Sequence, residues 1–235
     1  MRPRGYDPHL LLDPHFMTAT DPGPGAGAQH PDPASAARRR KARFWDRIAR
    51  KYAADPIADP AGYERTLERV QGLLSPQQLV LEIGCGTGST ALRLAQGTRR
   101  LLATDVSGEM IAIAREKHAG SPLPQLEFAV AEADAGTLGH EAWDAVLAFN
   151  VLHLVDDLDR TLELAVAALK PGGLLIAKTP CVGEMNPLIP RLALPLMRML
   201  GKAPAVLCFD GAALQAAMAR HGLRIDAAER HGSGR

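Results

Sequence analysis

Short apolar runs alternate with helical patterns through the middle of this chain, and this alternation is the strongest constraint on its fold. The apolar runs cover residues 79–83, 101–104, 126–130, 145–149 and 174–179, and helical patterns separate most of them. Parallel strands need a crossover connection, which is usually a helix. The pattern therefore predicts an α/β fold, a doubly wound and mostly parallel sheet with helices on both faces.

Composition excludes several other classes of protein. The 235 residues are 46% hydrophobic and 23% charged, as in an ordinary globular domain, and the net charge of +1 predicts no stable nucleic-acid partner. The three cysteines, Cys85, Cys181 and Cys208, are far apart and include no C-x-x-C pair, so neither a disulfide framework nor a structural zinc site is expected. No apolar stretch is long enough to span a bilayer or to serve as a secretory signal, and we expect a cytoplasmic protein without a transmembrane segment.

The chain divides into a tail and one domain. Residues 1–37 are rich in proline and glycine and are expected to form a disordered tail, whereas residues 38–235 form the domain. The domain opens on a basic helical segment in which Phe44, Ile48 and Tyr52 recur every four residues, which predicts one buried face. Its basic run is interpreted either as a patch for a membrane or nucleic acid or, more simply, as a solvated helix face.

A glycine-rich turn follows the first predicted strand and carries the strongest chemical signal. The sequence after the strand is Gly84-Cys85-Gly86-Thr87-Gly88, and the next strand ends at Asp105, with Ser107 favoured as the cap of the following helix. Strands one and two are neighbours in a doubly wound sheet, so Asp105 could bind both hydroxyls of a ribose beside the turn. Ser89 replaces the third glycine of a dinucleotide fingerprint, and no Gly-Lys-Ser or Gly-Lys-Thr follows. We therefore predict an adenosine-containing ligand without a pyrophosphate.

These residues resemble the class I S-adenosylmethionine-dependent methyltransferases, including the ubiquinone-biosynthesis type. The segment Glu82–Gly88 resembles the family's E/D-x-G-x-G-x-G motif, and Asp105 its second-strand acidic residue. Ala133–Ala135 resembles the segment that contacts adenine, and Leu169–Leu175 resembles the family's L-K-P-G-G turn. The resemblance covers roughly residues 42–230 and implies a Rossmann-like fold with S-adenosyl-L-methionine as the cofactor.

The resemblance also implies a role for particular residues. Glu82 would hold the amino group, Asp105 the ribose, and Met110 the adenine ring, although Met110 is equally typical of a helix core. Asp134 would accept from the exocyclic amine of adenine or, alternatively, cap a short segment. The implied cofactor-binding residues are Glu82, Gly84, Cys85, Gly86, Gly88, Asp105, Val106, Met110, Asp134, Ala135 and Asn150.

The methyl acceptor is less well defined. His153 follows the fourth strand and is the candidate general base, with a structural role as the alternative. No metal-ligand pattern occurs. The segment 181–209 is rich in leucine, methionine and proline and is interpreted either as a lid over a lipophilic small-molecule pocket or as a helical hairpin that completes the core. The expected reaction is methyl transfer to such an acceptor; the alternatives are a cofactor-binding protein without activity and a nucleic-acid or protein methyltransferase.

The end of the chain departs from the family's pattern. Residues 223–228 could form a sixth strand, but too few residues follow for the seventh, antiparallel strand that usually lies between strands five and six. We therefore expect a truncated or frame-shifted product in which strand five has an unpaired edge. The sequence does not indicate the oligomeric state.

Overall fold

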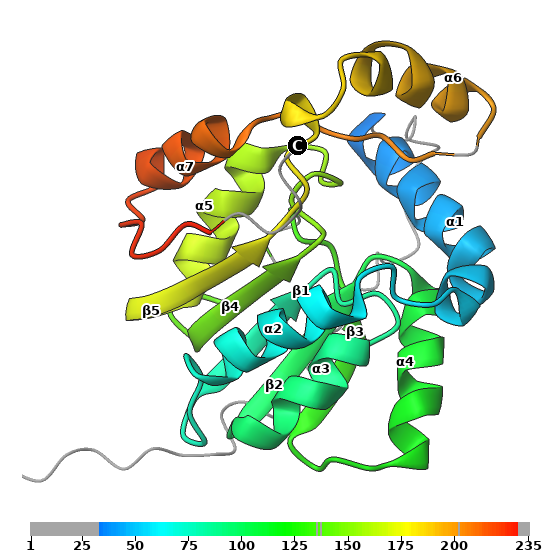
Figure 1. Ribbon diagram of the computed structural model, residues 1–235. Coiled ribbons are helices and arrows are strands. Elements are labelled where there is room, and N and C mark those ends of the chain that lie inside the picture. Colours follow the sequence, from blue (N-terminus) through cyan, green and yellow to red (C-terminus); the bar gives the residue numbers. More distant parts are fainter. Residues whose placement is uncertain (1–32, 135, 137, 202, 230–235) are drawn as a thin grey trace, which may run out of the picture. The chain divides into compact units, whose positions relative to one another are not determined.

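A parallel sheet of five strands forms the centre of the protein in its computed structural model, which describes residues 33–134, 136, 138–201 and 203–229 (Figure 1). The strand order is β3-β2-β1-β4-β5, and all four pairings are parallel. The strands are β1 (Leu79–Ile83), β2 (Arg100–Asp105), β3 (Leu126–Val130), β4 (Trp143–Phe149) and β5 (Leu169–Lys178). The predicted doubly wound α/β fold is thereby confirmed.

Helices begin where side chains can cap their free N–H groups. Asp59, Ser107, Asp157 and Asp210 each accept a hydrogen bond from a backbone N–H in the first turn of the helix that follows. The α-helices are α1 (Pro33–Ala54), α2 (Pro60–Gln71), α3 (Ser89–Leu94), α4 (Gly108–Gly120), α5 (Leu158–Ala168), α6 (Leu194–Met199) and α7 (Gly211–Arg220). Shorter helical turns are η3 (Ala95–Gly97), η4 (Val182–Glu184) and η5 (Ile189–Ala193).

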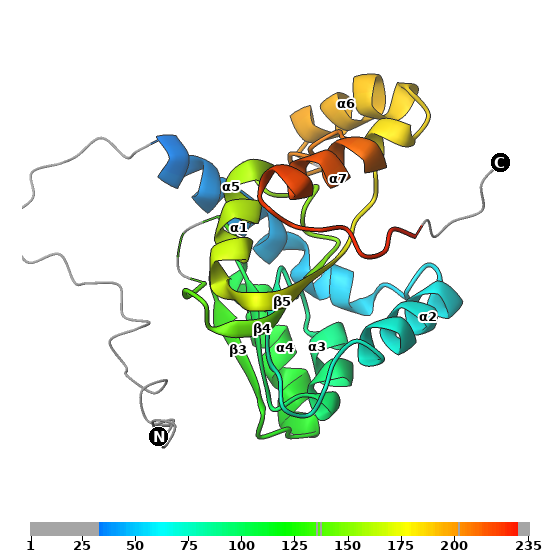
Figure 2. The same ribbon diagram turned by 90° about the vertical axis from the view of Figure 1, so that its left-hand side faces the viewer.

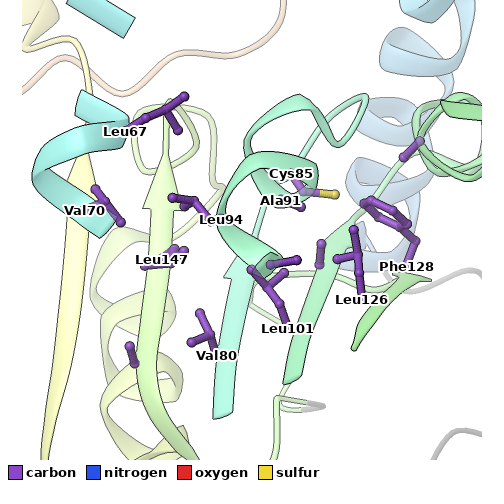
Figure 3. Close-up of a cluster of buried hydrophobic side chains, with 14 of the residues drawn as sticks. Leu67, Val70, Val80, Cys85, Ala91, Leu94, Leu101, Leu126, Phe128 and Leu147 are labelled. Carbon is purple, nitrogen blue, oxygen red and sulfur yellow. The ribbon is translucent and has the colours of Figure 1, made fainter. Parts of the chain in front are cut away.

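The two faces of the sheet bury different helices because side chains alternate along each strand. Val80 joins a cluster with residues of α2, α3 and α4 (Figure 3), whereas Leu81 and Ile83 join a second cluster with residues of α5 and α7. Figure 2 shows α5 and the pair α2 and α3 on opposite sides of the strands. The fully buried β1 therefore forms the middle of the domain.

The β5 strand is longer than the sequence pattern predicts. It begins at Leu169, which pairs with Trp143, and the next pairing joins Leu174 to Ala145 across an irregular stretch. The stretch contains Pro171, which has no backbone N–H to donate to a ladder. Among the described residues β5 also forms one edge of the sheet, as predicted.

The buried face of α1 is not the predicted one. Tyr52 is 51% exposed, whereas Ala49 is fully buried and packs with Met110 and Ile113 of α4. Trp45 and Ala53 flank the same contact, so the buried face lies one residue further along than the predicted face. The small side chain of Ala49 allows the two helices to approach closely at this point.

The structure differs from two expectations about the ends of the chain. The helix α1 begins at Pro33, so residues 33–37 do not belong to the predicted disordered tail, and the rest of that tail lies outside the described residues. Residues 223–228 form no strand and are mostly exposed, so the prediction of a sixth strand is wrong. A strand needs a partner for its backbone groups, and none of the described segments pairs with β5 on its outer side.

The segment 181–209 contains η4, η5 and α6 but buries little apolar surface. Val182 and Ala203 are buried, whereas Leu188, Leu192 and Met199 are at least 64% exposed. The end of α6 is held to α1 by a hydrogen bond of 2.6 Å from Arg47 Nη2 to the carbonyl of Gly201. The described part of this segment is therefore not a hairpin that completes the core.

Candidate functional site

A cavity of about 510 Å³ opens at the carboxyl ends of the central strands. Its wall includes Glu82 of β1, Asp105 of β2, Glu132 after β3 and Asn150 after β4. The strand order reverses at β1, because β2 lies on one side of it and β4 on the other. Ligands bind at this kind of switch point in open α/β sheets.

The glycine-rich turn brings the backbone to the cavity wall. Gly84 and Gly86 line the cavity and have φ angles of 68° and 54°, in the left-handed region that glycine adopts without strain. A Cβ at Gly84 would overlap Val151, whereas a Cβ at Gly86 would lie 3.9 Å from the Tyr52 ring. The turn therefore leaves an open surface at Gly86 for a ligand.

Gly88, the last glycine of the turn, packs against neighbouring elements of the domain. It is not among the residues that line the cavity, and a Cβ there would lie 2.7 Å from the Phe128 ring and 2.8 Å from the Ala114 Cβ. The missing side chain lets the turn pack against α4 and β3. Gly88 therefore packs beneath the site, and its predicted contact with the cofactor stays a prediction.

Asp105 connects the end of β2 with the glycine-rich turn. Its Oδ2 accepts from the Gly86 N–H at 2.9 Å, and its Oδ1 accepts from the Ser107 N–H at 2.9 Å. Burial raises the pKa of Asp105, while these backbone hydrogen bonds act in the opposite direction. Each carboxylate oxygen keeps a second lone pair, with which it can accept from a ligand hydroxyl.

Glu82 is the most unusual group in the cavity. Its side chain is 2% exposed, and its Oε2 has no hydrogen-bond partner among the described residues. Burial, and less strongly the charge of Asp105, raises the pKa of Glu82 to about 8. A buried polar atom without a partner is rare in proteins and costs free energy, so this oxygen is expected to bind a donor from a ligand.

The helix α1 forms an outer wall of the cavity through Arg38, Lys41, Trp45 and Tyr52. The Trp45 and Tyr52 rings meet edge to face, with their centroids 6.3 Å apart. Desolvation of the Tyr52 hydroxyl and the charge of Asp105 raise the pKa of Tyr52, so the phenol stays protonated near neutral pH. This wall was not predicted from the sequence, because the spacing of Phe44, Ile48 and Tyr52 predicts a buried position for Tyr52.

Two cations of α1 form ion pairs at the cavity. Arg38 Nε lies 3.4 Å from Glu132 Oε2, and Lys41 Nζ lies 2.8 Å from Asp156 Oδ2. Burial raises the pKa of Glu132, and the charge of Arg38 opposes that shift. Glu132 was also not predicted from the sequence; the available signal was its place close to the carboxyl end of a strand, as for Asp105.

Most of the other predicted residues gather at the cavity. Val106, Met110, Asp134 and Asn150 line it together with Cys85, and burial raises the pKa of the Cys85 thiol. Met110 is also 2% exposed and packs against Ala49, so it belongs to the core as well as to the wall. Ala135 lies outside the described residues.

His153 stands apart from this group. It does not line the cavity, its Nδ1 lies 3.0 Å from the Thr179 hydroxyl, and burial lowers its pKa. Its backbone carbonyl accepts from the Leu207 N–H at 2.8 Å. The structure therefore places this side chain between the end of β4 and the segment after β5, and its predicted role as a base stays a prediction.

Two further properties concern the described residues only. They contain no group of three or more histidine, cysteine, aspartate or glutamate side chains that could hold a metal ion. Within the same residues, no helix combines the length and the apolar character that crossing a membrane requires.

Known proteins are similar to part of this chain in sequence. Residues 80–173 match a family described as a methyltransferase domain. Over 140 residues the chain is 29% identical to a ubiquinone biosynthesis O-methyltransferase of Sinorhizobium medicae, an alignment that covers 60% of this chain and 51% of the relative. It is 36% identical over 120 residues to the highly reducing polyketide synthase PKS6 of Gibberella zeae, which covers 46% of this chain and 5% of that protein. The chain thus spans about half of the first relative and a small part of the second.

Solved structures share the fold. A Thermotoga maritima protein described as a S-adenosylmethionine-dependent methyltransferase, possibly a histamine N-methyltransferase, superimposes with a TM-score of 0.60 at 24% identity. The superposition covers 78% of this chain and 81% of that one. The fold is therefore that of the class I S-adenosylmethionine-dependent methyltransferases, and residues 80–173 are a methyltransferase domain. S-adenosylmethionine is the cofactor of that class.

Proposed function

We propose that this chain binds S-adenosylmethionine in the described cavity and transfers its methyl group to a small, lipophilic acceptor. The observation that carries the proposal is the buried, unpartnered Oε2 of Glu82 beside the turn that contains Gly84 and Gly86. The cofactor has an ammonium group that can donate to this oxygen.

The cavity offers a complementary group for each part of the cofactor. Glu82 would hold the ammonium group of the cofactor, and Asp105 would hold its ribose hydroxyls. Gly86 leaves space for the part of the cofactor that joins these two groups. Val106 and Met110 would contact the adenine ring, and Asn150 would lie at the methyl end. The group that accepts from the adenine amine is Asp134 or Glu132, because both line the cavity after β3. The proposed cofactor-binding residues also include Cys85, which lines the cavity, and Ala135, which follows Asp134 in the sequence.

The chain's own contribution to the reaction is orientation. The bound cofactor supplies a sulfonium-activated methyl group, whose carbon–sulfur bond breaks as the bond to the acceptor forms. The protein must hold the acceptor lone pair in line with that bond and exclude water from the reacting atoms. Glu82 in β1 and Asn150 just after β4 both line the cavity on neighbouring strands of the sheet, which suits this task.

Aromatic and aliphatic side chains in the cavity lining support a lipophilic acceptor. They stand beside the charged residues of the lining and provide apolar surface for an acceptor. The aromatic and aliphatic residues are Trp45, Tyr52, Pro56, Ile57, Tyr63, Phe149, Val151 and Leu154. Burial raises the pKa of Tyr63, so its phenol, like that of Tyr52, is neutral and can donate to a polar group of the acceptor.

A nucleic-acid acceptor has less support from the site. The two cations of α1 that reach the cavity, Arg38 and Lys41, are paired with Glu132 and Asp156. Phosphates would have to displace these carboxylates, and binding to the backbone of a nucleic acid depends on free cations. The small-molecule acceptor therefore remains the proposal.

Calorimetric titration with S-adenosylhomocysteine, beside NAD, tests the proposal. We expect the product analogue to bind and NAD not to bind. The variant Glu82→Gln should lose at least tenfold in affinity, because a neutral amide replaces the buried carboxylate at the ammonium site. Glu68→Gln, an exposed position on α2, is the matched control. A folded wild-type protein that binds neither ligand would contradict the proposal.

A further inference from the structure

Residues 185–200, here called the apolar segment, expose large hydrophobic side chains to solvent. Eight of the thirteen exposed large hydrophobic residues found in the described chain belong to this segment. They are Met185, Leu188, Ile189, Leu192, Leu196, Met197, Met199 and Leu200. A concentration of this kind on a surface usually marks a site of interaction.

The spacing within the apolar segment gives one continuous apolar row. Leu188, Leu192, Leu196 and Leu200 recur every four residues through η5 and α6, and their exposed fractions are 65%, 64%, 51% and 58%. Residues four apart are neighbours on a helix surface. Met199 adds a flexible side chain that is 79% exposed.

The charges beside this row are all positive. Arg191 and Arg198 are exposed, and no described carboxylate forms an ion pair with either of them. The sequence has no aspartate or glutamate between Glu184 and Asp210. An apolar surface with flanking cations is complementary to the interface of a bilayer that contains anionic lipids.

Two other occupants fit the observations less well. A second copy of the chain, related by a twofold axis, would bring Arg191 and Arg198 against the same arginines of its partner. A ligand in the cavity would not cover the apolar segment, because none of the described residues 181–209 lines the cavity. A lipid surface, in contrast, buries the leucines and attracts both arginines.

We propose that the apolar segment docks this protein on anionic membrane surfaces. The hydrogen bond from Arg47 to Gly201 connects the end of the segment with α1, and α1 also forms a wall of the cavity (Figure 1). Docking would therefore hold the cavity wall close to the bilayer. Docking would also allow a lipophilic acceptor to enter the cavity from the bilayer. This consequence rests on the proposed function, whereas docking itself does not.

Flotation of the full chain with lipid vesicles tests the proposal. We expect binding to phosphatidylcholine vesicles that contain phosphatidylserine and binding about 30-fold weaker to phosphatidylcholine alone, since two arginines contribute. Raising the salt concentration should weaken the binding to anionic vesicles. The double variant Leu192→Ser/Met199→Ser should lose binding to both, and Arg191→Gln/Arg198→Gln should lose the preference for anionic vesicles.

A matched control separates docking from general loss of surface hydrophobicity. Leu73→Ser/Ile225→Ser removes two residues that are 40% and 38% exposed outside the apolar segment and should bind vesicles like the wild type. Absence of vesicle binding by the wild type, or unchanged binding by Leu192→Ser/Met199→Ser, would overturn the proposal. Light scattering provides a second test. The proposal would also be overturned by a wild-type protein that self-associates but does not bind vesicles, if Leu192→Ser/Met199→Ser abolishes the self-association. Failure of S-adenosylhomocysteine to bind would overturn only the proposed function.

Discussion

The carboxylate of Asp105 accepts a hydrogen bond from the backbone N–H of Gly86 at 2.9 Å. This bond joins the end of β2 to the turn after β1, so the acidic residue shapes the turn as well as facing the cavity. The second carboxylate oxygen accepts from Ser107 at the start of α4. Three elements of the site therefore depend on one side chain.

We expect Asp105→Asn to lower the affinity for S-adenosylhomocysteine at least tenfold. An asparagine has only one acceptor oxygen, and its amide N–H groups would face either the Gly86 or the Ser107 donor. Calorimetry provides the measurement. Asp159→Asn, an exposed position on α5, is the control and should bind like the wild type. Equal affinities of the two variants for S-adenosylhomocysteine would show that Asp105 does not contribute to binding.

The raised pKa of Glu82 predicts a pH-dependent stability. The pKa is about 8 in the folded protein and near 4.5 in the unfolded chain, so the folded state holds one more proton between these values. The free energy of unfolding should therefore fall as pH rises from about 4.5 to about 8, by on the order of 1 kcal/mol per pH unit. Below pH 4.5 this contribution is constant.

Glu82→Gln tests this linkage, because glutamine does not titrate. Urea denaturation at pH 5.5 and pH 7.5 gives the two free energies for each protein. The variant should gain stability relative to the wild type at the higher pH. If the wild type and Glu82→Gln lose the same free energy of unfolding between pH 5.5 and pH 7.5, Glu82 is not the group that holds the extra proton in the folded state.

Two glycine substitutions should separate packing from binding. Gly88→Ala places a methyl group 2.7 Å from the Phe128 ring and should destabilise the protein by more than about 2 kcal/mol. Gly86→Ala meets only the Tyr52 ring at 3.9 Å, so it should cost about 1 kcal/mol for its left-handed backbone but weaken the binding of S-adenosylhomocysteine. Thermal denaturation and calorimetry measure the two effects. The reverse pattern would exchange the roles assigned to the two glycines.

Enlarging Ala49 should disturb both stability and the cavity wall. Ala49 is fully buried against Met110 and Ile113, so Ala49→Leu is expected to cost about 1–3 kcal/mol through overpacking. Ala54→Leu makes the same change at an exposed position of α1 and should be nearly neutral. Denaturation with urea compares them. Similar stabilities would contradict the described contact between α1 and α4.

His153→Gln should leave the affinity for S-adenosylhomocysteine unchanged within about twofold, because His153 does not line the cavity. Glutamine can still hydrogen bond to Thr179, which the imidazole contacts at 3.0 Å. Once an acceptor is found, the turnover number of this variant tests the predicted base directly. A loss of about 100-fold in turnover with unchanged cofactor affinity would assign that role to His153.

Sequence reasoning was most successful where the signal is contiguous. The buried strand β1, the turn through Gly84 and Gly86, and Asp105 were all predicted, because each depends on a few neighbouring residues. Their placement at one cavity followed from the parallel topology, which puts the ends of β1 and β2 at the same edge.

The errors concern contacts between distant segments. Phe44, Ile48 and Tyr52 have the spacing of a buried face, but a shift of one residue along the helix gives Trp45, Ala49 and Ala53 the same spacing. Hydrophobicity favoured the first set, whereas the fit of the small Ala49 against α4 decided the second. Residues 223–228 likewise have the alternation of a strand, but a strand also needs a partner, which composition does not provide.

The packing of α1 has a consequence for how access to the cavity is controlled. Ala49 is the one fully buried residue among the α1 positions whose burial is described, and the Arg38–Glu132 and Lys41–Asp156 ion pairs lie nearer the surface. A helix with so few buried side chains opens at a lower free energy than the sheet beneath it. Amide hydrogens of α1 should therefore exchange with solvent faster than those of β1, and opening of α1 would be the step by which ligands enter and leave.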